Sequence, residues 1–371
     1  MHEGSEPRDS VLAERGAEES WLEVDGVPYS GDGWKHHDQA VLACGNRRVS
    51  SRLAGMINRH MIPPLLIILA VIGSSSHAAA WNDLGHMMVS AIAYEQLTAE
   101  TRQKVTTLLK LNPKHATWVA DVPEDEKSRI AFLRASRWAD DIKLDPAYEQ
   151  DGSQNGNRPS GRESARNVGY EDRLQHKYWH FIDLPFSPDR TALVGPSSPN
   201  AQTQIALFRH TLTSTASSDS LKSYDLVWLI HLVADVHQPL HAVSRFDKAH
   251  MNGDDGGNGV MVCSPPCTAK ERLHAFWDTV LGVSMDPTTA IETAKQLPAA
   301  DPQLAAISDE RVWIQESFEA AQMHVYVSPI GIGVGPFELT DSYKAAAQHV
   351  AGQRMALAGT RLANLLNDAF R

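Results

Sequence analysis

The chain has 371 residues, of which 42% are hydrophobic, and its formal net charge is −11. This length and composition allow a sizeable buried core in one to three domains. Residues 81–371 contain 27 Lys and Arg against 35 Asp and Glu, a net charge of −8. The composition therefore excludes a basic surface that would hold a nucleic-acid duplex by its phosphates. If the substrate is a nucleic acid, bound metal ions must supply the positive charge.

The first 55 residues are polar, rich in Gly and without a sustained hydrophobic period. We interpret residues 1–55 as disordered, or as an extension produced by an upstream start codon. We interpret Met56 or Met61 as a better translation start than Met1.

Residues 56–80 have the features of a secretory signal peptide. A short basic region precedes an apolar run of about a dozen residues at 62–73, which is too short to span a bilayer securely. The stretch ends in three alanines, 78–80, which is typical of a cleavage site. We predict export to the periplasm or the exterior, with a mature chain that begins at Trp81. An uncleaved membrane anchor is the alternative.

The mature region, residues 81–371, predicts a single compact all-α domain with several helices. Hydrophobic periodicity indicates helices over residues 86–110, 130–142, 202–213, 223–238, 269–281, 288–296, 303–324 and 341–367. Stretches rich in Gly, Pro, Ser and Asn at 145–169, 242–267 and 328–337 predict long surface loops, with at most a short β-hairpin.

The stretch HLVADVHQPLH, residues 231–241, carries the clearest chemical signal. His231 and Asp235 are four residues apart, so on a helix both side chains lie on one face, one turn apart. Pro239 is expected to end that helix, because proline lacks an N–H and restricts the residue before it. His241 should then project from a turn. Two imidazoles and a carboxylate suit a borderline cation such as zinc, although a buried His/Asp pair that satisfies itself would have the same spacing.

Other histidines and carboxylates support the metal interpretation. His274 and Asp278 form a second pair four residues apart, and His180 lies in an aromatic run. His86 follows the predicted cleavage site, and Asp140 lies at a predicted helix end. Each residue alone is also compatible with a core role, but the combination predicts a polynuclear metal site.

Cysteine usage adds one structural expectation. Cys44 lies in the region expected to be lost, whereas Cys263 and Cys267 flank Ser-Pro-Pro. A disulfide closing this small loop would fit an oxidising compartment, and a two-Cys metal site is the alternative.

Six motifs, taken together and in order, resemble the S1/P1 nuclease family. They are WNDLGH at 81–86, RWAD at 137–140, HFID at 180–183, HLVADVHQPLH at 231–241, GGN at 256–258 and LHAFWD at 273–278. The resemblance implies a secreted, zinc-dependent, mostly α-helical enzyme of the phospholipase C/P1 nuclease type. Bacterial zinc phospholipase C is similar in fold and ligands but typically has Glu where this chain has Asp278, which favours the nuclease branch.

The resemblance also implies three zinc ions per chain and assigns their ligands. The first zinc would be held by Asp140, His180, His231 and Asp235, and the second by His241, His274 and Asp278. The third would be held by His86, a shared Asp235, and the α-amine and carbonyl of Trp81. The catalytic candidates are Asp140 and the shared ligand Asp235. Asp140 would orient or deprotonate the attacking water.

Four residues are candidates for substrate binding. Lys143 would contact the phosphate, or else be a solvated surface charge. By resemblance, Phe181 would stack on a base and Asp183 would accept a hydrogen bond from the base edge; Phe181 as an ordinary core residue is the alternative. Asn258, in the Gly-rich loop, would approach the phosphate or the base.

The expected function is cleavage of single-stranded DNA and RNA to 5′-mononucleotides, with 3′-nucleotidase activity. The alternatives are a zinc-dependent phospholipase C and a metal-sequestering binding protein without turnover. We expect no stable membrane association after processing and infer no protein partner. His237 is expected to play a supporting or structural role, and the remaining mature histidines, Arg354, Gly359 and Arg361 are interpreted as structural.

Overall fold

The computed structural model describes residues 81–151 and 169–371. The expected N-terminal extension, the signal peptide, Cys44 and most of the predicted loop 145–169 lie outside the described residues. In the part of the chain that is described, no helix is long and apolar enough to cross a membrane.

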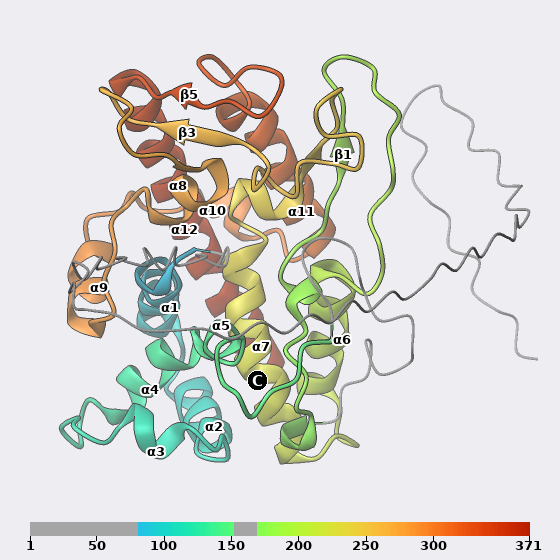
Figure 1. Cartoon of the computed structure of the whole chain (residues 1–371). Coiled ribbons are helices and arrows are strands. Elements are labelled where there is room, and N and C mark those ends of the chain that lie inside the picture. Colours follow the sequence, from blue (N-terminus) through green and yellow to red (C-terminus); the bar gives the residue numbers. More distant parts are fainter. Residues whose placement is uncertain (1–80, 152–168) are drawn as a thin grey trace, which may run out of the picture. The chain divides into compact units, whose positions relative to one another are not determined.

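Helices dominate the described chain (Figure 1), which confirms the all-α expectation. In chain order they are α1 (Asp83–Gln96), α2 (Ala99–Leu109), α3 (His115–Trp118), α4 (Lys127–Ala135), α5 (Trp138–Asp141), α6 (Ala201–Thr213), α7 (Asp219–Asp235), α8 (Leu273–Thr279), α9 (Pro287–Ala294), α10 (Pro302–Ala305), α11 (Glu310–Ala320) and α12 (Asp341–Ala369). Single turns of other helix types are η2 (Gly169–Glu171), η3 (Lys177–His180), η4 (Pro239–Ala242) and the π-type η5 (Ala321–Val325).

Two small sheets accompany the helices, where the sequence predicted at most one hairpin. In the first, β1 (Pro185–Phe186) pairs in parallel with β2 (Ser244–Arg245). In the second, β3 (Met261–Cys263) lies between antiparallel β4 (Glu271–Arg272) and parallel β5 (Phe337–Glu338). The extra pairings join segments distant in sequence, and strands of two or three residues carry little periodic signal of their own.

Helix α7 is the centre of the fold. Every residue from Ser223 to Asp235 is buried, so the helix is enclosed on all faces rather than amphipathic. Figure 1 shows it running between α6 on one side and α1, α4 and α5 on the other. Any polar side chain on its last turns is therefore held away from bulk water and must find a partner inside the protein.

Side-chain caps explain where several predicted helices divide. The expected helix 86–110 breaks at Leu97 because Thr98 accepts a hydrogen bond from the Thr101 N–H and starts α2. The expected helix 303–324 breaks in the same way, since Asp309 caps α11 through the Arg311 N–H. Local side-chain bonds of this kind compete with a continuous helix, and hydrophobic periodicity does not detect them.

Two further predicted helices have bounds different from those expected. The helix predicted over 130–142 divides between α4 and α5. The helix predicted over 223–238 ends at Asp235, and Pro239 occupies the first position of η4 instead of directly terminating α7. Proline suits that position because its missing N–H would have no helical partner there.

The long C-terminal helix α12 packs closely against α1. A Cβ atom on Gly359 would lie 2.6 Å from the Ile92 Cβ, so the two helices approach too closely for a side chain there. On either side of Gly359, Arg354 and Arg361 both contact the carboxylate of Glu316 on α11. These contacts agree with the structural role predicted for the helix, and they lie behind the end of α7.

Candidate metal centre

The predicted ligands come from six segments that converge at the end of α7. Helix α7 supplies His231 and Asp235, and η4, which follows it, supplies His241. The others are His86 on α1, Asp140 on α5, His180 on η3, and His274 with Asp278 on α8. Apart from Asp140, whose side chain is 12% exposed, these side chains are at most 5% exposed.

One group of ligand atoms surrounds the Asp235 carboxylate. Its Oδ2 lies 3.0 Å from His180 Nδ1 and 3.1 Å from His231 Nε2, and its Oδ1 lies 3.3 Å from His86 Nε2. Asp140 Oδ1 lies 3.8 Å from His180 Nδ1 and 3.7 Å from His231 Nε2. These atoms form two overlapping sets with room for metal ions, namely His86/His231/Asp235 and Asp140/His180/His231.

A second group is formed by His241, His274 and Asp278. The two imidazole Nε2 atoms are 3.1 Å apart, and the Asp278 Oδ2 is 3.6 Å from His274 Nε2. This set also has the arrangement of a metal site. The structure thus brings together all eight predicted side-chain ligands. They form groups at the end of α7 and at η4, the turn that follows it.

The chemistry of the second group fits a cation. The Nδ1–H of His241 donates to the His180 carbonyl, and that of His274 donates to the Gly256 carbonyl, each at 2.7 Å. Burial lowers the pKa of both imidazoles, that of His274 to about 4, so both are neutral at pH 7. Their Nε2 lone pairs therefore face each other. A tetrahedral zinc ion with Zn–N bonds of about 2.0–2.1 Å would hold two nitrogens about 3.3 Å apart and relieve this repulsion.

The first group fits a cation for related reasons. Both ring nitrogens of His86, Nε2 of His180 and Oδ1 of Asp235 are buried without a hydrogen-bond partner. Such groups rarely stay unsatisfied in a folded protein unless an ion or water occupies the site. His231 donates its Nδ1–H to the Ser136 carbonyl at 2.6 Å, which leaves Nε2 directed at Asp235 and Asp140. Fixing the imidazole through its other nitrogen is the usual support of a metal ligand.

The pKa shifts of the carboxylates describe a site that needs positive charge. Burial raises the pKa of Asp235 to about 6 and raises that of Asp278 well above its usual range. Burial would also raise the pKa of Asp140, but the Lys143 ammonium, 2.7 Å away, brings it below the ordinary value. Asp140 is therefore the carboxylate that stays ionised most readily.

Trp81 lies beside both groups. Its indole N–H donates to the carbonyl of Ala234, the residue before Asp235, and its side chain is fully buried. The backbone N–H of Asn82 donates to the Asp278 carbonyl at 3.3 Å. The first described residues are thus held next to ligands of two different groups.

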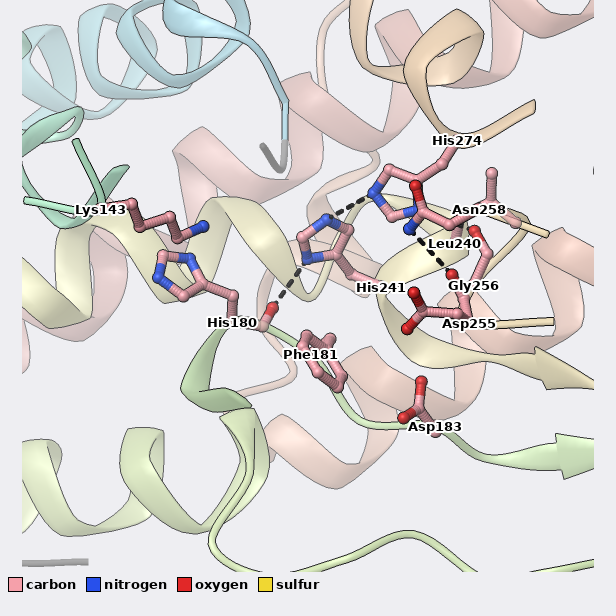
Figure 2. Close-up of a pocket in the computed structure, with 10 residues that line it drawn as sticks. All are labelled: Lys143, His180, Phe181, Asp183, Leu240, His241, Asp255, Gly256, Asn258 and His274. Carbon is pink, nitrogen blue, oxygen red and sulfur yellow. Dashed lines mark hydrogen bonds between the residues drawn. The ribbon is translucent and has the colours of Figure 1, made fainter. Parts of the chain in front are cut away.

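A pocket lined by three of these ligands, His180, His241 and His274, also contains all four predicted substrate-binding residues. Figure 2 shows Lys143 at one end, Asp183 and Asp255 near the other, and His241 with Phe181 between them. The complete lining is Lys143, His180, Phe181, Asp183, Leu240, His241, Asp255, Gly256, Asn258 and His274. Phe181 is only 7% exposed and also belongs to the hydrophobic core, so its packing serves both alternatives considered for it.

The Gly-rich loop contributes residues that were not predicted. Asp255 and Gly256 of this loop line the pocket beside Asn258, as does Leu240 of η4. Gly256 has φ +58°, and a Cβ atom there would lie 2.4 Å from the Leu240 carbonyl oxygen. The run of Gly and Asp residues predicted a surface loop, but only the tertiary contact with η4 reveals that this loop borders the pocket.

The described region matches a known family over almost its whole length. Residues 81–371 match the family model described as S1/P1 Nuclease. The chain belongs to the S1/P1 nuclease family. Among relatives, Endonuclease 3 of Arabidopsis thaliana is 23% identical over 338 residues, covering 84% of this chain and 95% of the relative. Endonuclease 2 of the same plant is 22% identical over 333 residues, covering 85% and 100%. Nuclease S1 of Aspergillus oryzae is 25% identical over 225 residues, covering 59% and 60%.

Membership of the S1/P1 family supports nuclease activity, and hence hydrolysis of nucleic acid. In this S1/P1 family member Cys263 and Cys267 form a disulfide, with Cα atoms 5.0 Å apart, so the two-Cys metal site is excluded. The family is zinc-dependent, and the three His/Asp groups supply the kind of donors that zinc requires.

The other histidines in the described part of the nuclease lie outside these groups. His237 points away from the metal groups, donating to the Val233 carbonyl and accepting from Arg361. His176 is fully buried in a polar and aromatic cluster. It stacks on Trp179 with ring centroids 3.5 Å apart and lies between the carboxylates of Asp151 and Asp172, each 2.7 Å away. This cluster packs against Trp228 behind His180.

Proposed function

We propose that the mature chain is an exported trizinc phosphodiesterase that cleaves single-stranded DNA and RNA to 5′-mononucleotides and removes 3′-phosphates from nucleotides. The observation that carries the proposal is the convergence of three His/Asp groups beside one pocket, which is lined by His180, His241 and His274. Bound zinc would lower the pKa of coordinated water, offset the phosphate charge and stabilise the leaving oxygen.

The proposed zinc ligands follow the predicted assignment. Asp140, His180, His231 and Asp235 would hold the first ion, and His241, His274 and Asp278 the second. His86, Asp235 and the α-amine and carbonyl of Trp81 would hold the third. The two faces of the Asp235 carboxylate support its sharing between ions, because Oδ1 faces His86 and Oδ2 faces His180 and His231.

Two residues are proposed to act on the scissile phosphate. Asp140 is kept ionised by Lys143 and borders the metal groups, so it can orient the attacking water or accept its proton. Lys143 lines the pocket with its ammonium group and would pair with a phosphate oxygen. Attack of water on phosphorus would break the bond to the 3′-oxygen, so the phosphate would remain on the 5′-carbon of the released nucleotide.

The opposite end of the pocket is proposed to recognise the base. Phe181 would stack on it, Asp183 would accept from an N–H on its edge, and Asn258 would approach the phosphate or base. Stacking accepts any base but requires that base to be unpaired.

Metal analysis tests the zinc proposal. The purified mature protein should contain about three zinc ions, because nine ligand residues are proposed and zinc usually takes four ligands. Chelation should lower its melting temperature, because an ion that binds only the folded state stabilises it. Mass spectrometry of the native protein and a melting curve with and without chelator give both results. One zinc ion or none after gentle purification would contradict the assignment.

Substrate form tests the nuclease proposal. We expect a strong preference for single-stranded over double-stranded DNA of the same sequence at moderate salt. The acidic chain offers a duplex little to bind, and base stacking on Phe181 requires an unpaired strand. Initial rates should be measured on both DNA forms, on RNA, on a 3′-nucleotide and on phosphatidylcholine vesicles. Equal rates on the two DNA forms would contradict the base site, and hydrolysis of the lipid alone would favour phospholipase C. No turnover on any substrate would favour the metal-sequestering alternative.

A further inference from the structure

We infer that Gln238 is a positioning residue that aims the Asp278 carboxylate at the second metal group and fixes that group relative to Asp235. The inference rests on the proposed zinc function. Gln238 is fully buried in the corner between α7 and η4, and it belongs to none of the proposed ligand sets.

The backbone of Gln238 links ligands of two groups. Its N–H donates to the carbonyl of Asp235 at 2.9 Å, and its own carbonyl accepts from the His241 N–H at 3.0 Å. The last ligand on α7 and the first ligand on η4 are therefore both bonded to this one residue.

The side chain of Gln238 adds a third ligand to the same unit. Its Oε1 accepts from the Leu240 N–H at 2.5 Å, and its Nε2 donates to Asp278 Oδ1 at 2.8 Å. The orientation of the amide is determined, because a backbone N–H can only donate and so requires the oxygen on its side. The NH₂ group is left to face Asp278, which lies forty residues farther along the chain.

The hydrogen bond from Gln238 gives the two Asp278 carboxylate oxygens different partners. Oδ1 is occupied by Gln238, while Oδ2 lies 3.6 Å from His274 Nε2 and faces the metal group. Without the amide, the carboxylate would lose this hydrogen bond at Oδ1 and could rotate about its terminal torsion, which has a broad energy profile. Partners that hold a ligand in this way typically contribute 10–100-fold to metal affinity.

The corner that carries Gln238 is held rigidly from the other side. Arg354 donates to the His237 carbonyl at 3.3 Å and Arg361 donates to His237 Nε2 at 3.0 Å. Ser317 donates to the Val236 carbonyl at 2.5 Å. Because the preceding two residues are bonded to α11 and α12, the backbone that carries Gln238 is anchored independently of Asp278.

Gln238→Asn is the sharpest test. Asparagine readily accepts a hydrogen bond from the N–H two residues ahead, so the bond to Leu240 can persist. The shorter side chain withdraws the NH₂ group by one carbon–carbon bond from Asp278. The matched control is Gln204→Asn, because Gln204 is 2% exposed on α6 and its amide bonds only to Thr203. Asp278→Asn identifies the zinc-binding step that belongs to the second group.

Zinc affinity should be measured by competition with a chelator on the folded mature proteins, together with melting curves of the metal-free forms. In Gln238→Asn one zinc ion should bind about 10–100-fold more weakly, at the same step that Asp278→Asn weakens. The other two should keep wild-type affinity, and the metal-free melting temperature should change no more than in the control. Adding Gln238→Asn to Asp278→Asn should cause no further loss at that step.

The outcomes separate the inference from the function. Fewer than three zinc ions in the wild type would contradict the proposed function and the inference with it. Three ions in the wild type with unchanged affinity in Gln238→Asn would overturn the inference alone, as would an equal loss in Gln204→Asn. If Gln238→Asn does not fold, Gln238→Glu keeps the side-chain length and the acceptor for Leu240 but places a carboxylate against Asp278. Unchanged binding at the Asp278 step in that variant would equally overturn the inference.

Discussion

Asp235→Asn should remove most of the activity of the mature enzyme and about two of the three proposed zinc ions. Asp235 is fully buried, and its two oxygens face different histidines of the first group. An asparagine offers one oxygen and one NH₂ group, so it cannot act as a ligand in both directions. We expect kcat to fall by more than about a hundredfold, since even loss of a supporting partner costs 10–100-fold.

Asp183→Asn is the matched comparison, because it makes the same chemical change at the base end of the pocket. Asp183 lines the pocket but belongs to none of the metal groups. Its variant should keep three zinc ions and change mainly KM, as expected when binding to the substrate is weakened. Steady-state kinetics and metal analysis of both variants provide the measurement. Equal metal content and equal kcat in the two would show that Asp235 is not a shared ligand.

Removal of the proposed signal peptide should switch the enzyme on. In the precursor the Trp81 nitrogen is an amide, whose lone pair is delocalised into the carbonyl, so it is a poor ligand at neutral pH. Cleavage after Ala80 would turn it into an α-amine with a pKa of about 7.7–8.0. Zinc can displace the remaining proton from such a ligand. The hydrogen bond from the Trp81 indole to the Ala234 carbonyl would hold this new terminus beside Asp235.

Three purified forms test this prediction. They are the chain that begins at Trp81, the same chain with one additional N-terminal Met, and Trp81→Ala with a free amine. The Met-extended form should lack one zinc ion and most of the activity, while the other two groups still fill. Three zinc ions and full activity in the extended form would show that the N-terminus is not a ligand. If Trp81→Ala keeps its metal, the amine and carbonyl are the ligands and the indole ring only packs the terminus in place.

The parts of the site predicted best from the sequence are those that depend on local geometry. His231 with Asp235, and His274 with Asp278, lie on α7 and α8 as the spacing of four residues predicts. The order of the six motifs indicated the family, and the family model matches the region predicted to be the mature chain. Helix boundaries were predicted less well. Leu97 is apolar and fits the helical period, but the cap formed by Thr98 ends the helix there.

The sequence by itself thus determined the helical class, the metal chemistry and the ligand types, because periodicity and i, i+4 spacing are properties of neighbouring residues. The family resemblance implied which ligands share a group, but only the tertiary structure shows how closely those ligands approach one another. His86 meets Asp235 across almost 150 residues, and the Gln238 amide meets Asp278 across forty. Such contacts depend on how α1, α7 and α8 pack, which no local pattern encodes. The same reason applies to Asp255. Its neighbours in sequence indicate only a loop, but the packing of this loop against η4 makes Asp255 part of the pocket lining.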